Sequence, residues 1–167
     1  MVAAEQGHRA DSNVMSRVNP VHQRLECFMR EALQEGRKAL PACLPNPPVG
    51  CVLVKDGVII ARGHTNPPGR PHAEAMALSQ VAGDLREVMA VVTLEPCSFD
   101  GRTPSCAVAL IARNVGRVVV ALIDPHPRNQ GRGIRMLEQA GIPVTLGVLQ
   151  AEADLSAYLW KGVTEQG

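Results

Sequence analysis

The sequence has no apolar run of 18 or more residues and no continuous apolar segment near its start. The first absence argues against a membrane-spanning helix, and the second argues against a secretory signal peptide. Neither sign of charge dominates, because 17 basic residues face 16 acidic ones for a net charge of +1. A basic surface of the kind that follows nucleic-acid phosphates is therefore not indicated. These absences favour a cytoplasmic protein with a small-molecule partner and with no nucleic-acid or membrane partner.

The length of 167 residues suffices for one compact domain, which buries about two-thirds of the surface of its unfolded chain. Residues 1–18 are polar or small and show no period, so we expect a mobile N-terminal tail ahead of a domain over 19–167. In a reducing compartment, the five cysteines are expected to serve as core residues, metal ligands or nucleophiles and not as disulfides.

The spacing of the apolar residues changes along the chain. From Pro20 to Gly36 they recur at helical spacing, which predicts an amphipathic helix. β-branched runs on both sides of Asp56-Gly57 predict a hairpin over residues 49–63. Further helices are expected over 72–81, 104–113, 132–140 and from about 151, and further strands over 88–94, 117–123 and 143–146. This order predicts an α/β fold, a three-layer α-β-α sandwich with a mixed central sheet.

His72, Cys97 and Cys106 all fall where a strand or loop passes into a helix, at the strand ends where open α/β sheets bind ligands. Taken singly, a histidine here is more often a solvated helix cap, and a cysteine is more often a small core residue. Together they offer one nitrogen and two thiolates, the donor set of a catalytic zinc ion that keeps one position open. Because two thiolates cancel the charge of zinc, we expect helix N-termini to direct N–H groups at the sulfurs.

The order of these residues adds to their chemistry. "HAE" is followed by "EPC" and then by a second cysteine, which is the signature order of the zinc nucleobase deaminases. In that signature the glutamate, here Glu74, moves protons and is not a metal ligand. An isolated glutamate in a first helical turn would more often only complement the helix dipole. The adjacent His72 favours the catalytic interpretation.

Eight residues separate Cys97 from Cys106, where the short form of the signature has two. Four segments follow one another in this order: "PNPPVGCVLVKDGVII", "PHAEAMAL", "VTLEPCSFDGRTPSC" and "DPHPRNQGRGIRML". With them, the chain resembles the deaminase domain of the bifunctional riboflavin-biosynthesis deaminase/reductase family over most of residues 20–160. The long spacing between the cysteines is a feature of that family.

The resemblance implies a cytidine deaminase-like fold, with zinc on His72, Cys97 and Cys106 and with Glu74 as proton shuttle. It also implies a standalone deaminase domain, because the reductase domain of the family has no counterpart before Gly167. A homo-oligomer, with a dimer favoured, suits a short chain of this fold.

The resemblance also assigns substrate contacts. Asn46 would hold the heterocycle, Arg102 would bind the substrate phosphate, and Asp124 would lie near the ribose and phosphate. By themselves, Asn46 and Asp124 are equally typical of turns, and an exposed arginine is ordinary surface.

Three residues depart from the family: Phe99 replaces a histidine, while His126 and Ser156 each replace an asparagine. All three lie in segments that the family associates with the sugar-phosphate side, so a changed substrate is one expectation. His126 is either a new substrate contact or a solvated loop histidine.

The expected activity is hydrolytic release of ammonia from an amino-substituted N-heterocycle, with Glu74 moving protons from the attacking water to the ring nitrogen and the leaving ammonia. The riboflavin-pathway diaminohydroxy-phosphoribosylamino-pyrimidine is the favoured substrate, because Asn46, Arg102 and Asp124 are all present. Another nucleobase, nucleoside or pterin-like compound of specialised metabolism is the alternative. A noncatalytic zinc-containing interaction protein would not need Glu74, and a polynucleotide deaminase would need a basic path that the composition lacks.

Overall fold

The computed structural model describes residues 20–159, so the mobile tail expected over 1–18 lies outside the described residues. Its centre is one five-stranded sheet with the strand order β2-β1-β3-β4-β5. Strand β1 (Gly50–Lys55) is antiparallel to both of its neighbours, β2 (Val58–His64) and β3 (Val88–Leu94). The strands β3, β4 (Arg117–Leu122) and β5 (Val144–Leu146) are parallel. The predicted mixed sheet is thus confirmed.

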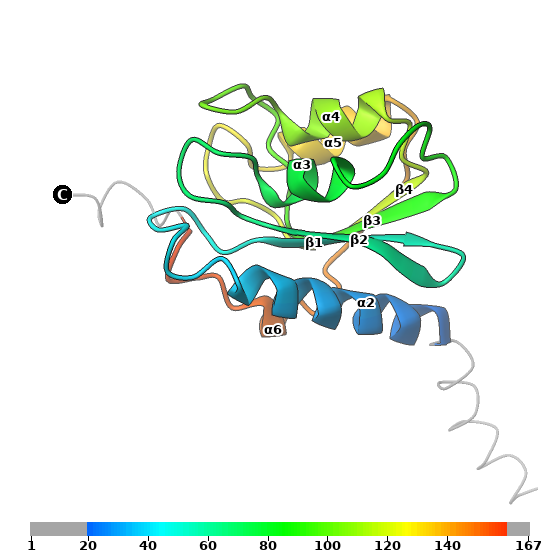
Figure 1. Cartoon of the computed structure of the whole chain (residues 1–167), viewed down its shortest axis with the longest axis horizontal. Helices are drawn as coiled ribbons and strands as arrows, with labels where there is room; N and C mark the ends of the chain where they lie inside the picture. Colours follow the sequence, from blue (N-terminus) through cyan, green and yellow to red (C-terminus); the bar gives the residue numbers. More distant parts are fainter. Residues whose placement is uncertain (1–19, 160–167) are drawn as a thin grey trace, which may run out of the picture.

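Helices cover both faces of this sheet (Figure 1). One face carries α2 (Pro20–Arg37) and the short α6 (Gln150–Ala153). The other face carries α3 (Ala73–Leu78), α4 (Cys106–Ala112) and α5 (Arg132–Gln139). This arrangement confirms the predicted three-layer α-β-α sandwich.

Strand β1 illustrates why the sequences of the strands are continuous runs of apolar residues. Cys51 and Leu53 belong to the core cluster under α3, α4 and α5, whereas Val52 and Val54 belong to the cluster under α2. Successive side chains of a strand point to opposite faces, and here both faces are buried. Over residues 20–159, no helix combines the length and the apolar character that crossing a membrane requires.

The predicted hairpin forms at Asp56-Gly57, whose φ angles are 51° and 76°. At the far end of β2, Gly63 packs directly against α3. A Cβ atom at this position would overlap the carbonyl oxygen of Ala73. The missing side chain therefore lets the first turn of α3, which follows His72, lie close on the sheet.

Two helix boundaries differ from the sequence prediction. Helix α3 ends at Leu78 and not near Val81, because the chain continues in tight turns in which Val81 N–H donates to the Leu78 carbonyl. Helix α4 begins at Cys106, two residues after Pro104, because Ser105 is its N-cap and accepts the N–H of Val108.

Candidate metal centre and active site

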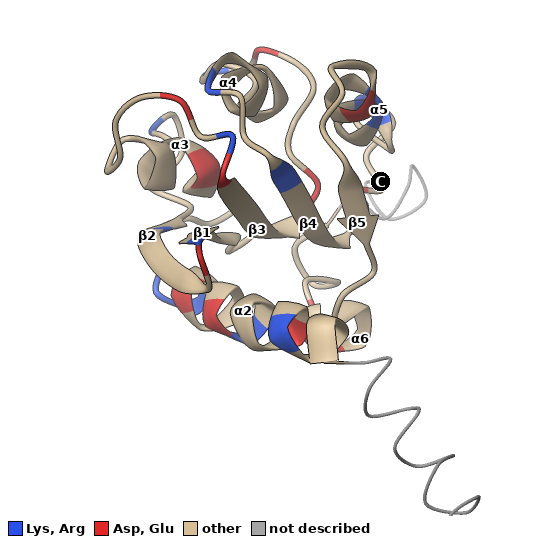
Figure 2. Ribbon diagram, turned by 90° about the vertical axis from the view of Figure 1, so that its right-hand side faces the viewer, with Lys and Arg blue, Asp and Glu red and all other residues tan. Residues whose placement is uncertain are grey.

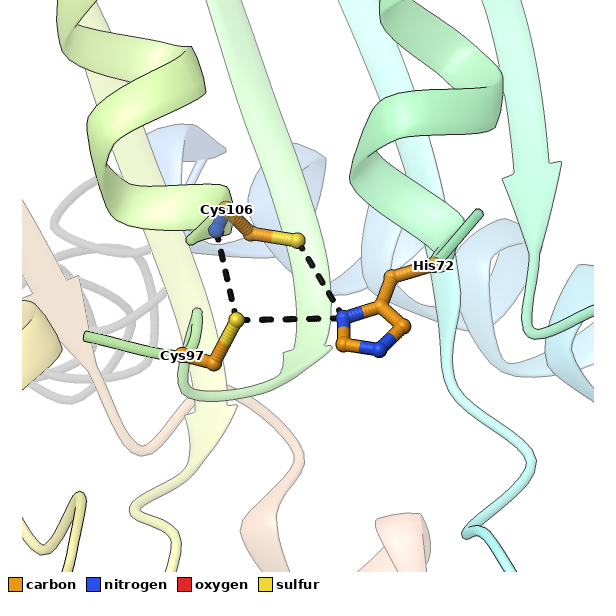
Figure 3. A group of neighbouring side chains, drawn as sticks. All are labelled: His72, Cys97 and Cys106. Atoms are coloured by element: carbon orange, nitrogen blue, oxygen red, sulfur yellow. Dashed lines mark hydrogen bonds between the residues drawn. The ribbon is translucent and has the colours of Figure 1, made fainter. Parts of the chain in front are cut away.

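Three side chains from separate parts of the fold meet beyond the carboxyl end of β3, the central strand, and point toward one another (Figure 3). His72 precedes α3, Cys97 follows β3, and Cys106 is the first residue of α4. The His72 Nδ1 atom lies 3.8 Å from Cys97 Sγ and 3.4 Å from Cys106 Sγ. All three ligand atoms lie within 4.8 Å of one another. One nitrogen and two sulfurs so placed fit the donor preference of a zinc ion with an open fourth position.

The insert between the two cysteines closes into a loop through its own polar groups. Ser105 Oγ donates to the Cys97 carbonyl oxygen over 2.7 Å, and Ser105 N–H donates to Asp100 Oδ1 over 2.8 Å. These bonds bring the ends of the loop together although eight residues separate the cysteines. The longer spacing is therefore compatible with one shared metal site.

The same loop orients the histidine. Thr103 Oγ1 lies 3.1 Å from His72 Nε2. When Nε2–H donates to this hydroxyl, the Nδ1 atom keeps its lone pair directed at the two sulfurs, as a metal ligand requires. Sequence reasoning missed this role of Thr103, and the only available signal was a hydroxyl residue within the insert.

The two sulfurs differ in their hydrogen bonding. The side-chain hydrogen bond with Cys106 lowers the pKa of Cys97 to about 5; burial raises it, and the bonds from His72 and from the Cys106 N–H lower it further. The Cys106 N–H lies at the start of α4 and donates to Cys97 Sγ over 3.2 Å, as expected for a helix N-terminus beside a thiolate. The pKa of Cys106 is raised, because its thiol gives a hydrogen bond to Cys97 and is buried.

Glu74 lies in α3 beside this cluster and is only 4% exposed. Burial raises the pKa of Glu74 to about 7, and the nearby Cys97 sulfur raises it too; a backbone hydrogen bond, His72 and a bond from Cys106 act in the opposite direction. A carboxyl group with a pKa near neutrality can both accept and donate a proton at physiological pH. Glu74 is therefore suited to proton transfer.

The cluster opens into a pocket of about 250 Å³. The pocket is lined by Asn46, Pro47, Val49, Thr65, His72, Glu74, Leu94, Glu95, Cys97, Phe99, Asp124, His126, Arg128, Tyr158 and Leu159. A larger surface depression of about 680 Å³ lies between Lys55 and Arg86, but no member of the histidine–cysteine cluster lines it. The chemistry therefore assigns the site to the smaller pocket.

The structure brings three of the four sequence-predicted substrate residues into this pocket: Asn46, Asp124 and His126. Arg102 does not line the pocket. Its side chain is exposed and lies beside Gly69.

The carboxylate of Asp124 is engaged within its own loop. It accepts the His126 N–H over 3.0 Å and the Asn129 side-chain amide over 3.4 Å. Asp124 thus acts as a turn residue in the pocket wall. Of the residues that depart from the family, Phe99 and His126 line the pocket, whereas Ser156 does not and donates to Asp154 over 3.2 Å.

Glu95 is a pocket residue that sequence reasoning missed, although it directly precedes the Pro-Cys pair. Its buried carboxylate accepts three backbone N–H groups, from Asp124 over 3.1 Å, from Gly131 over 2.9 Å and from Ile134 over 3.2 Å. Through these hydrogen bonds, Glu95 connects the end of β3 to the loop that follows β4 and to the first turn of α5.

Arg128 is a second missed residue. It lines the pocket, and its Cζ atom lies 4.3 Å from the centroid of the Phe99 ring. Nothing in the local sequence indicates this contact, because Phe99 and Arg128 lie in different loops.

Comparisons with known proteins agree with this site. The sequence profile of the cytidine and deoxycytidylate deaminase zinc-binding region matches residues 22–122. The riboflavin biosynthesis protein RibD of Escherichia coli is 46% identical over 129 residues, which are 77% of this chain and 35% of that protein. The chain thus spans about a third of the length of the curated relatives it matches.

Two solved structures extend the comparison. A diaminohydroxyphosphoribosylaminopyrimidine deaminase/5-amino-6-(5-phosphoribosylamino)uracil reductase from Thermotoga maritima is 42% identical, with a TM-score of 0.75 over 79% of this chain and 38% of its own. A structure from work on A-to-I editing by tRNA:A34 deaminases is 29% identical, with a TM-score of 0.60 over 75% of this chain and 95% of its own. The profile match covers more than half of the chain and contains His72, Glu74 and both cysteines of the cluster, so the chain belongs to the family of the cytidine and deoxycytidylate deaminase zinc-binding region.

Proposed function

We propose that the protein is a zinc-dependent hydrolase that releases ammonia from an amino-substituted N-heterocycle. The observation that carries this proposal is the position of Glu74, which lines the same pocket as His72 and Cys97. A structural zinc site would not need a buried carboxyl group beside its ligands. The proposed substrate is the riboflavin-pathway diaminohydroxy-phosphoribosylamino-pyrimidine, which the likeness to RibD proteins supports.

His72, Cys97 and Cys106 would hold the zinc ion, and their donor atoms fit it in number, chemistry and spacing. Zinc supplies Lewis acidity that lowers the pKa of water and so provides a nucleophile at neutral pH. The Thr103 hydroxyl keeps the His72 ring in the orientation and tautomer that binding needs.

Glu74 would take a proton from the attacking water and pass it to the ring nitrogen next to the attacked carbon. It would then take the second proton of that water oxygen and give it to the amino group, so that the C–N bond breaks, ammonia leaves and the carbon keeps the oxygen as a carbonyl. The burial of Glu74 keeps bulk water away from the proton path.

Asn46 is proposed to orient the heterocycle. Its side-chain amide lines the pocket and makes no hydrogen bond within residues 20–159. An amide offers both a donor and an acceptor to the edge of a ring.

The pocket volume of about 250 Å³ lies just below the usual range for ligand sites and suits the heterocyclic ring, so the ribose and phosphate of the proposed substrate would lie toward the open side of the pocket. Charges of both signs are mixed along α2 (Figure 2), and the net charge is +1, so the composition does not favour a polynucleotide substrate. A nucleobase, nucleoside or pterin-like compound remains the alternative substrate class.

A screen for ammonia release tests the proposal. Purified, zinc-loaded protein is incubated with the riboflavin-pathway pyrimidine, nucleobases, nucleosides and pterins, with the zinc-loaded Glu74→Gln variant as control. We expect ammonia from the riboflavin-pathway compound and only background release from the variant. Full zinc occupancy without ammonia from any heterocycle would point instead to a noncatalytic zinc protein.

We also propose that the protein acts in the cytoplasm as a homodimer. The described cysteines are all free, which is compatible with a reducing compartment. Sedimentation equilibrium of the zinc-loaded protein measures the oligomeric state directly, and a monomer at micromolar concentration would contradict the dimer.

A further inference from the structure

Arg128 is exposed, but its guanidinium group lies over an aromatic ring of the pocket wall. Its Cζ atom lies 4.3 Å from the centroid of Phe99, within the range of a cation–π contact. Both side chains line the pocket that contains His72 and Glu74. A positive charge thus lies at the wall of the candidate active site.

In the part of the chain that the structure describes, this guanidinium group has no acidic partner. Within residues 20–159, no carboxylate forms an ion pair with Arg128, and its side chain donates no hydrogen bond to a protein acceptor. Asp124, in the same loop, is already engaged by the His126 N–H and the Asn129 amide. By contrast, the Arg113 side chain donates to the backbone carbonyls of three residues and so serves the fold, as the bonds to Leu78, Val81 and Gly83 show. The donors of Arg128 remain available to a ligand.

Hydrogen bonds connect the backbone around Arg128 to the loop that carries Cys97. The Arg128 carbonyl accepts the Ser98 hydroxyl over 3.3 Å, and its N–H donates to His126 Nδ1 over 3.1 Å. The next residue, Asn129, is fully buried; its Oδ1 atom accepts the Ser98 N–H over 3.1 Å and its amide donates to the Pro96 carbonyl over 3.3 Å. The position of Arg128 relative to Cys97 is therefore set by several hydrogen bonds.

We propose that Arg128, held over Phe99, binds the phosphate of the substrate while the heterocycle lies against Glu74 and the metal ligands. A planar guanidinium fork matches two phosphate oxygens, and an arginine stacked on an aromatic ring loses less freedom when it binds. The proposal rests on the proposed function and specifies how that site recognises its substrate. The sequence-based expectation assigned the phosphate to Arg102, which does not line the pocket.

Steady-state ammonia release by the zinc-loaded full chain tests this. With Arg128→Gln, we expect KM for the phosphorylated pyrimidine to rise about 10- to 100-fold, the range of a lost charge-assisted hydrogen bond, while kcat stays within about two-fold. Neither constant should change for the dephosphorylated compound, because it has no group for Arg128 to bind. A purely structural defect would instead affect both compounds alike.

Matched variants sharpen the comparison. Arg24→Gln removes the same charge from an exposed position on α2, across the sheet from the pocket, and should change neither KM. Phe99→Leu removes the ring under the guanidinium and should raise KM for the phosphorylated compound alone, whereas Phe99→Tyr should retain the wild-type value. Loss of discrimination in Arg102→Gln but not in Arg128→Gln would overturn the assignment.

A binding measurement separates this inference from the proposed function. Ribose 5-phosphate and ribose are titrated into zinc-loaded wild-type and Arg128→Gln proteins and followed by calorimetry. We expect the wild-type protein to prefer the phosphate and the variant to lose that preference. Equal binding of ribose 5-phosphate to both proteins, or no preference over ribose in the wild type, would refute the role of Arg128. Absence of turnover of the pyrimidine by the wild type would refute only the proposed substrate.

Discussion

The Nε2 atom of His72 lies 3.1 Å from the Oγ1 atom of Thr103, a residue of the insert between the two cysteines. The insert therefore both connects two candidate ligands and orients the third. We expect Thr103→Val to weaken zinc binding by about 10- to 100-fold, the usual effect of losing a hydrogen-bond partner behind a metal ligand. Thr103→Ser should retain the affinity, because it keeps the hydroxyl. Competition with a chromophoric chelator measures both, and an unchanged affinity in Thr103→Val would contradict the orienting role.

Removing both candidate thiolates should abolish the metal site. We expect the Cys97→Ser, Cys106→Ser double variant to lose the zinc that the wild-type protein binds at one ion per chain, because serine is a poor ligand for this ion. Elemental analysis after dialysis gives the stoichiometry, and circular dichroism shows whether the sheet and helices persist. The double variant Cys27→Ser, Cys43→Ser removes two thiols outside the cluster and is the matched control. Zinc retained by the first variant at the wild-type ratio would remove these cysteines from the site.

Glu74→Gln separates proton transfer from metal binding. The amide has the size of the carboxyl group but cannot carry the proton, so we expect kcat to fall by about 10² to 10⁴. Zinc content and melting temperature should stay close to wild type, since Glu74 is not one of the three candidate ligands. Near-normal ammonia release by the zinc-loaded variant would be incompatible with the assigned role.

Glu95 should contribute to stability through the backbone groups that it accepts. In Glu95→Ala, the N–H groups of Asp124, Gly131 and Ile134 lose their acceptor, and each unsatisfied buried donor costs about 1–3 kcal/mol. Only the hydrogen bond from Ile134 is fully buried, whereas those from Asp124 and Gly131 are part-buried. We therefore expect the free energy of unfolding, measured in urea, to fall by about 1–3 kcal/mol. Glu138→Ala on the exposed side of α5 is the control and should change it by less than about 0.5 kcal/mol. A Glu95 variant as stable as that control would show that the donors find other acceptors.

The buried Glu35 should make stability depend on pH at the acid end. Burial raises its pKa, but the hydrogen bonds from His64 Nδ1 over 2.7 Å and from Lys38 Nζ over 3.0 Å lower it below 4.5. A carboxyl group with a lowered pKa in the folded state stabilises the fold above its unfolded pKa, and this contribution is lost as the pH falls through the folded pKa.

The difference in melting temperature between the wild type and Glu35→Gln should therefore be largest near neutral pH and shrink below about pH 4.5. Glu31→Gln removes an exposed carboxylate from the same helix, where it pairs with Arg62, and should have a small effect at all pH values. A difference in melting temperature for Glu35→Gln that does not vary with pH would contradict the lowered pKa of Glu35.

Local patterns determined much of the fold. The helix from Pro20, the turn at Asp56-Gly57 and the alternation of strands and helices after it all follow from periods and turn residues that neighbouring positions encode. The boundaries near Val81 and Pro104 were less predictable, because capping by Ser105 and tight turns after Leu78 decide them.

The chemistry of the cluster was also visible in the sequence, because His72, Glu74 and the two cysteines belong to an ordered motif whose elements lie beside one another in this fold. The tertiary structure alone placed Arg128 on Phe99 and left Arg102 outside the pocket wall. The physical reason is that the direction of a loop side chain depends on contacts between loops that follow different strands. Glu95 shows the same dependence, since the donors that it accepts lie 29 to 39 positions further along the chain.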